Sequence, residues 1–216
     1  MEPRLQHLQQ IATLQRKTRM QKTFDFYFDF GSLAAYLAHT QLPHICADTG
    51  ARVQMLPMLL GGVFQATGNA APMTVPAKGK YLITDMQRYA KSYGVPLNFN
   101  PFFPIITTTL MRMVTGLQMR SDPQLQHFMD TVYAAIWVDG MNMNDPAVVA
   151  EVLTGAGFAA AEMLAMANEQ ATKDQLKAVT MRAVERGVFG APTFFVGEDM
   201  YWGQDRIEQV KSALKH

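Results

Sequence analysis

The sequence predicts an α/β fold in which a β-α-β unit near the beginning of the chain and a β-β-α unit at its end flank a long block of helices. Three observations support this prediction. Residues 24–30 alternate with a period of two, residues 61–187 carry helical periodicity, and residues 193–202 form two short apolar runs around a turn. The two strand-bearing units therefore lie at opposite ends of the sequence.

The first strand is predicted from the segment FDFYFDF at residues 24–30. Its Phe side chains fall on one face, and Asp25, Tyr27 and Asp29 fall on the other, because successive side chains of a strand point to opposite faces. The high aromatic content also favours a strand. We therefore expect a strand through Phe30 with one apolar face.

A helix and a second strand follow. Ser32 is placed to cap a helix that runs to about Asp48, and Gly50 is placed to end it. Pro43 lies inside this segment and is expected to kink the helix. Residues 52–57 then predict a second strand, parallel to the first and joined to it by a right-handed crossover.

The middle of the chain, residues 61–186, predicts helices separated by loops. Apolar and aromatic side chains recur at helical spacing before Gly94, between residues 125 and 136, and again before Gly187. Asp145-Pro146 predicts a helix start, because Asp caps the first turn and Pro is favoured at the first helical position.

The last unit is predicted to be a hairpin and a helix. Residues 193–196 and 200–202 are short apolar runs around Gly197-Glu198-Asp199, and Asp205 is placed to cap a final helix over residues 206–215. The whole order is that of a thioredoxin-like fold split by a large all-helical insertion. We assign residues 23–60 and 187–216 to the thioredoxin-like domain and residues 61–186 to the insertion domain.

Residues 1–22 are interpreted as a basic N-terminal extension outside the fold. They hold five Lys or Arg residues against Glu2 alone and lack the apolar core of a secretory signal. An organelle-targeting segment remains the alternative interpretation.

Composition limits the class of function. The chain has 216 residues, 49% of them hydrophobic, and a net charge of +1, so neither nucleic acid nor a membrane is an expected partner. Cys46 is the only cysteine, which excludes an intramolecular disulfide and a Cys-x-x-Cys pair and fits a reducing, cytoplasmic environment. His39 and His44 flank Pro43 at a spacing that suits no metal, and we expect none.

Four segments, in this order, resemble the kappa-class glutathione transferase family, whose fold is a DsbA-like thioredoxin fold with a helical insertion. Together they cover roughly residues 24–214. They are Phe26-Tyr27-Phe28-Asp29-Phe30-Gly31-Ser32, Gly68-Asn69 with Pro76-Ala77-Lys78-Gly79-Lys80-Tyr81, Phe189-Gly190-Ala191-Pro192-Thr193-Phe194, and Trp202-Gly203-Gln204-Asp205-Arg206.

The resemblance implies that glutathione is the cofactor and that Ser32 is the catalytic residue. Ser32 and Ala35 stand where a thioredoxin-fold oxidoreductase has its two cysteines, so the chain lacks dithiol chemistry there. A hydroxyl at a helix N-terminus can donate a hydrogen bond to a bound thiolate and lower its pKa. The alternative role of Ser32 is that of an N-cap, and one hydroxyl can fill both roles.

The family also implies the other contacts. Ala191-Pro192 is expected to be a cis peptide that pairs with the cysteinyl part of glutathione, and Asn69 is expected to contact glutathione as well. Gln204 and Asp205 are implied at its γ-glutamyl end. Without the resemblance, Asn69 is a turn residue, Pro192 begins an edge strand and Asp205 is a helix cap.

Lys78 and Arg206 are the implied contacts for an anionic substrate, although each is by itself a typical surface charge. Phe102, Phe103, Trp137 and Trp202 are candidate apolar walls for the substrate, with burial in the core as the alternative for each. Family members usually have Pro after the active-site Ser, and this chain has Leu33 there.

The function implied is a homodimeric, glutathione-dependent isomerase of a small aromatic carboxylate in bacterial naphthalene degradation. In it, the thiolate of glutathione adds reversibly to the conjugated open form of the substrate. A glutathione transferase or peroxidase of broad specificity is the first alternative. A non-catalytic thioredoxin-fold module that binds peptides along the Ala191-Pro192 loop is the second.

Overall fold

The computed structural model describes residues 22–215, so the predicted extension at residues 1–22 lies, except for Lys22, outside the described residues. The predicted order of elements is confirmed. In chain order the elements are β1 (Thr23–Phe28), α2 (Leu33–Thr49), β2 (Arg52–Pro57), α3 (Leu60–Thr67), the 3-10 turn η1 (Pro72–Thr74), α4 (Pro76–Tyr93), α5 (Thr108–Met119), α6 (Leu125–Trp137), α7 (Pro146–Gly155), α8 (Ala160–Asn168), α9 (Gln170–Glu185), β3 (Thr193–Val196), β4 (Asp199–Trp202), the 3-10 turn η2 (Gln204–Arg206) and α10 (Ile207–Lys215).

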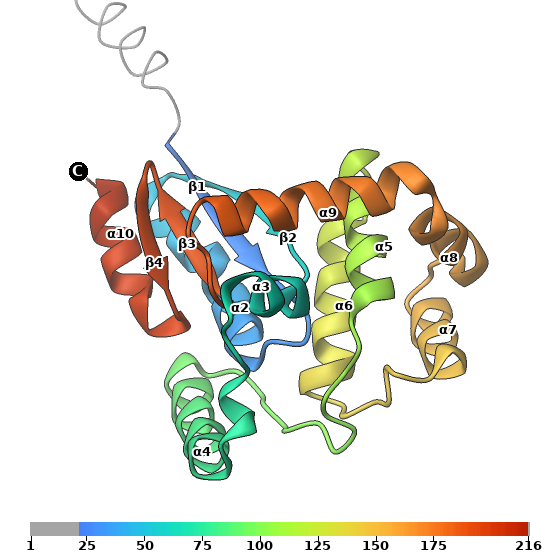
Figure 1. Cartoon of the computed structure of the whole chain (residues 1–216), viewed down its shortest axis with the longest axis horizontal. Helices are drawn as coiled ribbons and strands as arrows, with labels where there is room; N and C mark the ends of the chain where they lie inside the picture. The colour runs from blue at the N-terminus through green and yellow to red at the C-terminus, as the bar shows by residue number, and fades with distance from the viewer. Residues whose placement is uncertain (1–21, 216) are drawn as a thin grey trace, which may run out of the picture.

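The four strands form one mixed sheet in the order β2-β1-β3-β4 (Figure 1). β1 pairs in parallel with β2 and antiparallel with β3, and β3 forms the predicted hairpin with β4. Phe26 is the middle of this arrangement, opposite Met55 on one side and Phe194 on the other. The first and last units of the sequence are therefore joined through β1.

Both faces of the sheet are covered by helices. Phe24, Phe26 and Phe28 belong to a large core cluster that includes side chains of α2, α5, α6 and α10. Tyr27 and Phe195 belong to a second cluster on the other face, with side chains of α3 and α9. The prediction of one apolar face is thus too simple, because α3 and α9 cover the face on which Tyr27 lies.

The large core cluster also joins the sheet to the helical block. It contains Phe28 and Phe30 together with Phe128, Tyr133 and Trp137 of α6. In Figure 1, α5 to α8 gather on one side of the sheet, α9 returns across it to β3, and α4 lies apart from that group. Among the described helices, none is long and apolar enough to cross a bilayer.

Strand β1 ends at Phe28, two residues earlier than predicted. Asp29 and Phe30 instead enter a tight turn in which the Ser32 N–H donates to the Asp29 carbonyl at 3.0 Å. The Asp29 side chain is buried and does not face solvent as the alternation predicted. This turn brings Ser32 to the start of α2.

Helix α2 begins and ends as predicted. Ser32 is its N-cap, with a side chain that accepts from the Ala35 N–H, and Gly50 ends it with a left-handed φ of 70°. Pro43 lies within the continuous helix. The helix is therefore fixed at both ends by local sequence.

The start of the last helix differs from the prediction. Asp205 lies in the middle of the 3-10 turn η2, and α10 begins only at Ile207. Asp205 is therefore not the N-cap of the last helix. The physical reason is the preceding Gly203, whose φ of 109° turns the chain sharply out of β4 and leaves room for one tight turn before the α-helix.

Candidate active site

Ser32 is 7% exposed and makes two hydrogen bonds through its side-chain oxygen. The Ser32 hydroxyl donates to the Ala191 carbonyl at 2.9 Å, and it accepts from the Ala35 N–H at 3.1 Å. The second bond is the predicted cap. The first bond joins the start of α2 to a loop 159 residues further along the chain.

That loop, residues 189–192, contains the predicted cis peptide between Ala191 and Pro192. Each of its four carbonyl groups accepts a hydrogen bond from a different residue. The pairs are Asn69 Nδ2 to Phe189 O at 2.8 Å, Thr193 Oγ1 to Gly190 O at 2.8 Å, Ser32 Oγ to Ala191 O at 2.9 Å, and Gly203 N to Pro192 O at 3.0 Å. The loop is therefore the point at which Ser32, Asn69 and the Gly203-Gln204 segment meet.

The first turn of α2 offers backbone donors beside this loop. The N–H groups of Leu33 and Ala34 have no acceptor among the described residues, because Ser32 Oγ takes only the Ala35 N–H. Unpaired N–H groups and the positive end of the helix dipole both favour an anion. The site is thus suited to hold a thiolate or carboxylate.

Gln204 is the second buried polar group of the site. It is 5% exposed, and its side-chain amide donates to and accepts from no other described residue. Among the described residues, the fully buried side-chain atoms without a partner are His39 Nδ1 and the Tyr133 hydroxyl, so the Gln204 amide keeps some exposed surface at which a ligand can supply hydrogen bonds. Asp205 and Arg206 follow it and pair with each other at 3.4 Å.

The structure does not bring all of the predicted residues together. Asn69 lies against the cis-proline loop through Phe189, but Lys78 is exposed in the first turn of α4 and forms no ion pair with any described residue. Arg206 is also exposed, and its described ion-pair partner is the neighbouring Asp205. The loop 189–192 therefore collects the residues predicted to hold glutathione, whereas Lys78 and Arg206 remain on the surface.

The four predicted apolar walls divide into two groups. Trp137 is fully buried in the core, where its Nε1–H donates to the Phe30 carbonyl at 2.8 Å, and Phe103 packs beside it. For these two residues the core alternative is confirmed, and neither is an exposed wall. Phe102 and Trp202 are about half exposed, and the Trp202 indole lies against Gly190 and Phe189 of the cis-proline loop.

Ile106 is an apolar residue that the sequence reasoning missed. It is 75% exposed, and it lies between Ile105 and Thr107, whose atoms would be 3.4–3.6 Å from a Cβ added at Gly31. The loop that carries Ile106 therefore packs against the turn before Ser32. No feature of the sequence marks Ile106, because an isolated surface Ile is common and its neighbour in space, Gly31, is 75 positions away.

Asp29 supports the same turn and was also missed as a functional residue. Its carboxylate accepts hydrogen bonds from the Gly31 N–H, the Leu60 N–H and the Thr107 hydroxyl at 2.6–2.9 Å. Burial raises the pKa of Asp29, while these three hydrogen bonds act in the opposite direction. An Asp two residues before a Gly at the end of a strand is the available signal, since Asp side chains bind turn N–H groups.

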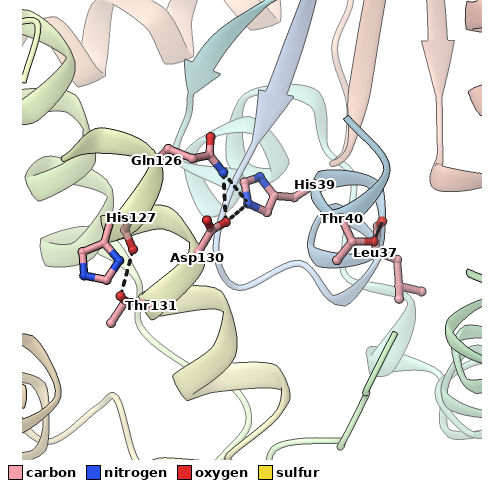
Figure 2. A network of polar contacts seen from close by, with 7 residues as sticks. All are labelled: Leu37, His39, Thr40, Gln126, His127, Asp130 and Thr131. Atoms are coloured by element: carbon pink, nitrogen blue, oxygen red, sulfur yellow. Dashed lines mark hydrogen bonds and ion pairs between the residues drawn. The ribbon is translucent and has the colours of Figure 1, made fainter. Parts of the chain in front are cut away.

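A second polar cluster lies further along α2 and contains His39 (Figure 2). Its Nε2 is 2.7 Å from Asp130 Oδ1 of α6, and Gln126 Nε2 is 2.9 Å from the same oxygen. His39 Nδ1 is buried without a partner. An unpaired lone pair on Nδ1 costs less free energy than an unpaired N–H there, so Nε2 carries the proton that is donated to Asp130.

The Ser32 hydroxyl donates to the Ala191 carbonyl and not to His39, so Ser32, His39 and Asp130 do not form a catalytic triad.

The described residues contain no group of three His, Cys, Asp or Glu side chains that could hold a metal ion. Cys46 is a partly buried free thiol whose pKa is raised by burial, which favours the unreactive protonated form.

The fold and the site together define the class of protein. It is a thioredoxin-fold protein of the DsbA type without the redox cysteines, with a four-stranded mixed sheet, a Ser-capped helix that faces a cis-proline loop, and a helical insertion. The model of the DSBA-like thioredoxin domain matches residues 23–215. The chain belongs to this family, in the group that contains the 2-hydroxychromene-2-carboxylate isomerases and, at lower similarity, the kappa-class glutathione transferases.

Relatives in that group align over almost their whole length. The 2-hydroxychromene-2-carboxylate isomerase of Sphingobium xenophagum is 32% identical over 197 residues, which cover 90% of this chain and 99% of the relative. Glutathione S-transferase kappa 1 of Rattus norvegicus is 24% identical, with 89% and 91% covered. A solved structure of a 2-hydroxychromene-2-carboxylate isomerase has 31% identity and a TM-score of 0.77, with 89% and 94% covered.

Proposed function

We propose that this protein is a glutathione-dependent isomerase that interconverts 2-hydroxychromene-2-carboxylate and trans-o-hydroxybenzylidenepyruvate. The proposal is carried by the Ser32 hydroxyl, which stands at the N-terminus of α2 against the cis-proline loop. The relatives named as this isomerase, at 31–32% identity over about nine tenths of the chain, support an enzyme of this class.

The residues of the site fit glutathione. Gln204 has a side-chain amide that pairs with no other described residue, and Asp205 beside it is a carboxylate suited to an ammonium group. The backbone of Ala191 is suited to an extended peptide, and Asn69 has a second amide hydrogen besides the one given to Phe189. Glutathione supplies a thiolate that adds to the conjugated alkene of the substrate and later leaves.

Ser32 prepares that thiolate. Its hydroxyl proton turns from the Ala191 carbonyl toward the sulfur, while its oxygen continues to accept from the Ala35 N–H. The unpaired N–H groups of Leu33 and Ala34 add the field of the helix N-terminus. Together these donors lower the pKa of the thiol and hold the sulfur in position.

The substrate side of the site combines apolar surface with positive charge. Phe102, Trp202 and Ile106 offer exposed apolar surface for the aromatic ring, and the loop of Ile106 packs against the turn before Ser32. Lys78 and Arg206 are the proposed cations for the carboxylate or the developing enolate. Leu33, which takes the place of the usual Pro directly after Ser32, is buried in the large core cluster.

The biological setting is part of the proposal. Degradation of naphthalene and related aromatic hydrocarbons would supply this substrate, and a cytoplasmic location fits an enzyme that uses reduced glutathione. A homodimer is expected by analogy with the family.

The test is the ultraviolet absorbance of 2-hydroxychromene-2-carboxylate mixed with purified protein, with and without reduced glutathione. Acceleration that depends on glutathione is the expected result. No acceleration under either condition would exclude the isomerase. Acceleration without glutathione would remove the proposed nucleophile.

A glutathione transferase of broad specificity is the second candidate. The similarity to kappa-class transferases over about 90% of both chains favours it, since the same glutathione site would serve and only the acceptor pocket would differ. Mass spectrometry of the products formed with 1-chloro-2,4-dinitrobenzene separates the two. A stable glutathione conjugate indicates the transferase.

A further inference from the structure

The insertion helix α4 reaches the Gln204 turn through its last residue. The hydroxyl of Tyr93 donates to the Gln204 carbonyl at 3.0 Å, immediately before Gly94 ends the helix. Gln204 and Tyr93 are 111 residues apart in the sequence. This bond therefore connects the helical block to the turn that follows the β-hairpin.

The side chains of the η2 turn make few polar contacts with the rest of the protein. Gln204 is 5% exposed, its side-chain amide forms no hydrogen bond with another described residue, and Asp205 and Arg206 form an ion pair with each other. Gly203 allows the sharp backbone bend before them, with φ at 109°. The position of the Gln204 amide is therefore set by its backbone, and Tyr93 holds the carbonyl of that backbone.

Tyr93 keeps its proton under all ordinary conditions. Burial raises its pKa to about 12, with smaller contributions from Tyr89, Asp205 and Glu208. A tyrosine that stays protonated is a permanent donor. Its ring also lies 5.8 Å from that of Tyr89, which restricts its orientation.

We propose that Tyr93 is a positioning residue for glutathione: by holding the Gln204 carbonyl it orients the buried Gln204 amide and the adjacent Asp205 toward the γ-glutamyl end of the ligand. The inference rests on the proposed function, because it assumes that glutathione binds at this site. It goes further in assigning part of the γ-glutamyl recognition to the helical insertion.

The experiment measures the dissociation constant of reduced glutathione by isothermal titration calorimetry for the wild type and for Tyr93→Phe, which keeps the ring and removes the hydroxyl. Tyr36→Phe is the matched control, because the Tyr36 hydroxyl also donates to a carbonyl, that of Pro96, at 2.7 Å. Melting by circular dichroism establishes that each variant is folded. Cysteinylglycine, which lacks the γ-glutamyl group, is titrated in parallel.

Tyr93→Phe is expected to raise the dissociation constant of glutathione about fivefold, the change that corresponds to one lost hydrogen bond. Cysteinylglycine should bind Tyr93→Phe and wild type alike, and Tyr36→Phe should bind glutathione like the wild type. In the double variant with Gln204→Leu, the effect of Tyr93→Phe should be smaller than in the wild-type background, because part of it acts through the Gln204 amide.

The role of Tyr93 would be overturned if Tyr93→Phe bound glutathione as tightly as the wild type. It would also be overturned if the losses of binding free energy caused by Tyr93→Phe and Gln204→Leu were simply additive in the double variant. An equal loss of affinity for cysteinylglycine would also overturn it, since a general structural role predicts that result. A wild type that binds no glutathione would overturn the proposed function itself, and this inference with it.

Discussion

Helix α2 carries two buried polar side chains, and their surroundings differ in a way that separates a ligand site from a structural contact. Ser32 at its N-terminus pairs with backbone atoms only, the Ala191 carbonyl and the Ala35 N–H. His39, seven residues later, pairs with a side chain of another helix, the carboxylate of Asp130. Both residues are less than a tenth exposed.

The Ser32 and His39 sites differ in whether a ligand can take the place of the side chain's present hydrogen-bond partner. The Ser32 hydroxyl proton can leave the Ala191 carbonyl for a thiolate, and the unpaired N–H groups of Leu33 and Ala34 stand beside it. The His39 proton is held by a carboxylate at 2.7 Å, and no nucleophile is paired with its other nitrogen. A histidine with a carboxylate partner is therefore, at this position, a contact between α2 and α6.

The strongest test of this contrast is Ser32→Ala, which should lower turnover of the chromene carboxylate about a hundredfold, by analogy with the loss of one oxyanion donor. Stability should fall by only about 1 kcal/mol, the usual value for an N-cap. Steady-state kinetics and chemical denaturation measure the two quantities. Ser92→Ala is the control, since Ser92 also bonds a carbonyl, that of Tyr89, but on the surface of α4. An unchanged turnover would reduce Ser32 to a cap.

Asp130→Ala tests the His39 contact of the same helix and should have a smaller effect of a different kind. It leaves the His39 N–H without its partner, which costs about 1 kcal/mol because Asp130 is half exposed and water can replace it. Turnover at saturating substrate should not change. Asp174→Ala, on the exposed face of α9, is the control for removing a surface carboxylate. A large loss of turnover in Asp130→Ala would give the His39 pair a role in catalysis.

The smallest effect is a dependence of stability on pH at the Ser32 end. Burial raises the pKa of Asp29, so the folded state holds its proton at a pH where the unfolded chain has lost it. The resulting stabilisation is complete below the unfolded pKa, near 4, and is lost as the pH rises through the folded pKa. The free energy of unfolding of the wild type should therefore fall, relative to that of Asp29→Asn, as the pH rises above about 4. Denaturant titrations at several pH values measure this, and a constant or growing difference would contradict it.

The local parts of the molecule followed from the sequence. Period-two alternation located β1, and Ser32, Gly50, Gly94 and Asp145 marked the helix ends where the structure has them. These features depend on neighbours along the chain, where steric and capping rules act directly. The cis peptide at Ala191-Pro192 was predicted only through the resemblance, because X-Pro bonds are ordinarily trans.

The parts that the sequence did not show depend on packing between distant segments. Segments far away in the sequence decide that the second face of the sheet is covered, that Trp137 is core while Phe102 is exposed, and that Ile106 is exposed. The unpaired amide of Gln204 was equally invisible, since only the folded chain shows which donors lack acceptors. Asp205 was misplaced because the backbone angle of Gly203 decided where the last helix begins.

The strand order has a consequence for how the protein is made. β1 lies between β2 and β3, and the ribosome delivers β3 only after the entire helical block has been synthesised. Until then one hydrogen-bonding edge of β1, with its row of phenylalanines, has no partner in the nascent chain. An unpaired apolar strand edge is a site of aggregation. We therefore expect chains that end between β1 and β3 to associate with other chains through this edge of β1.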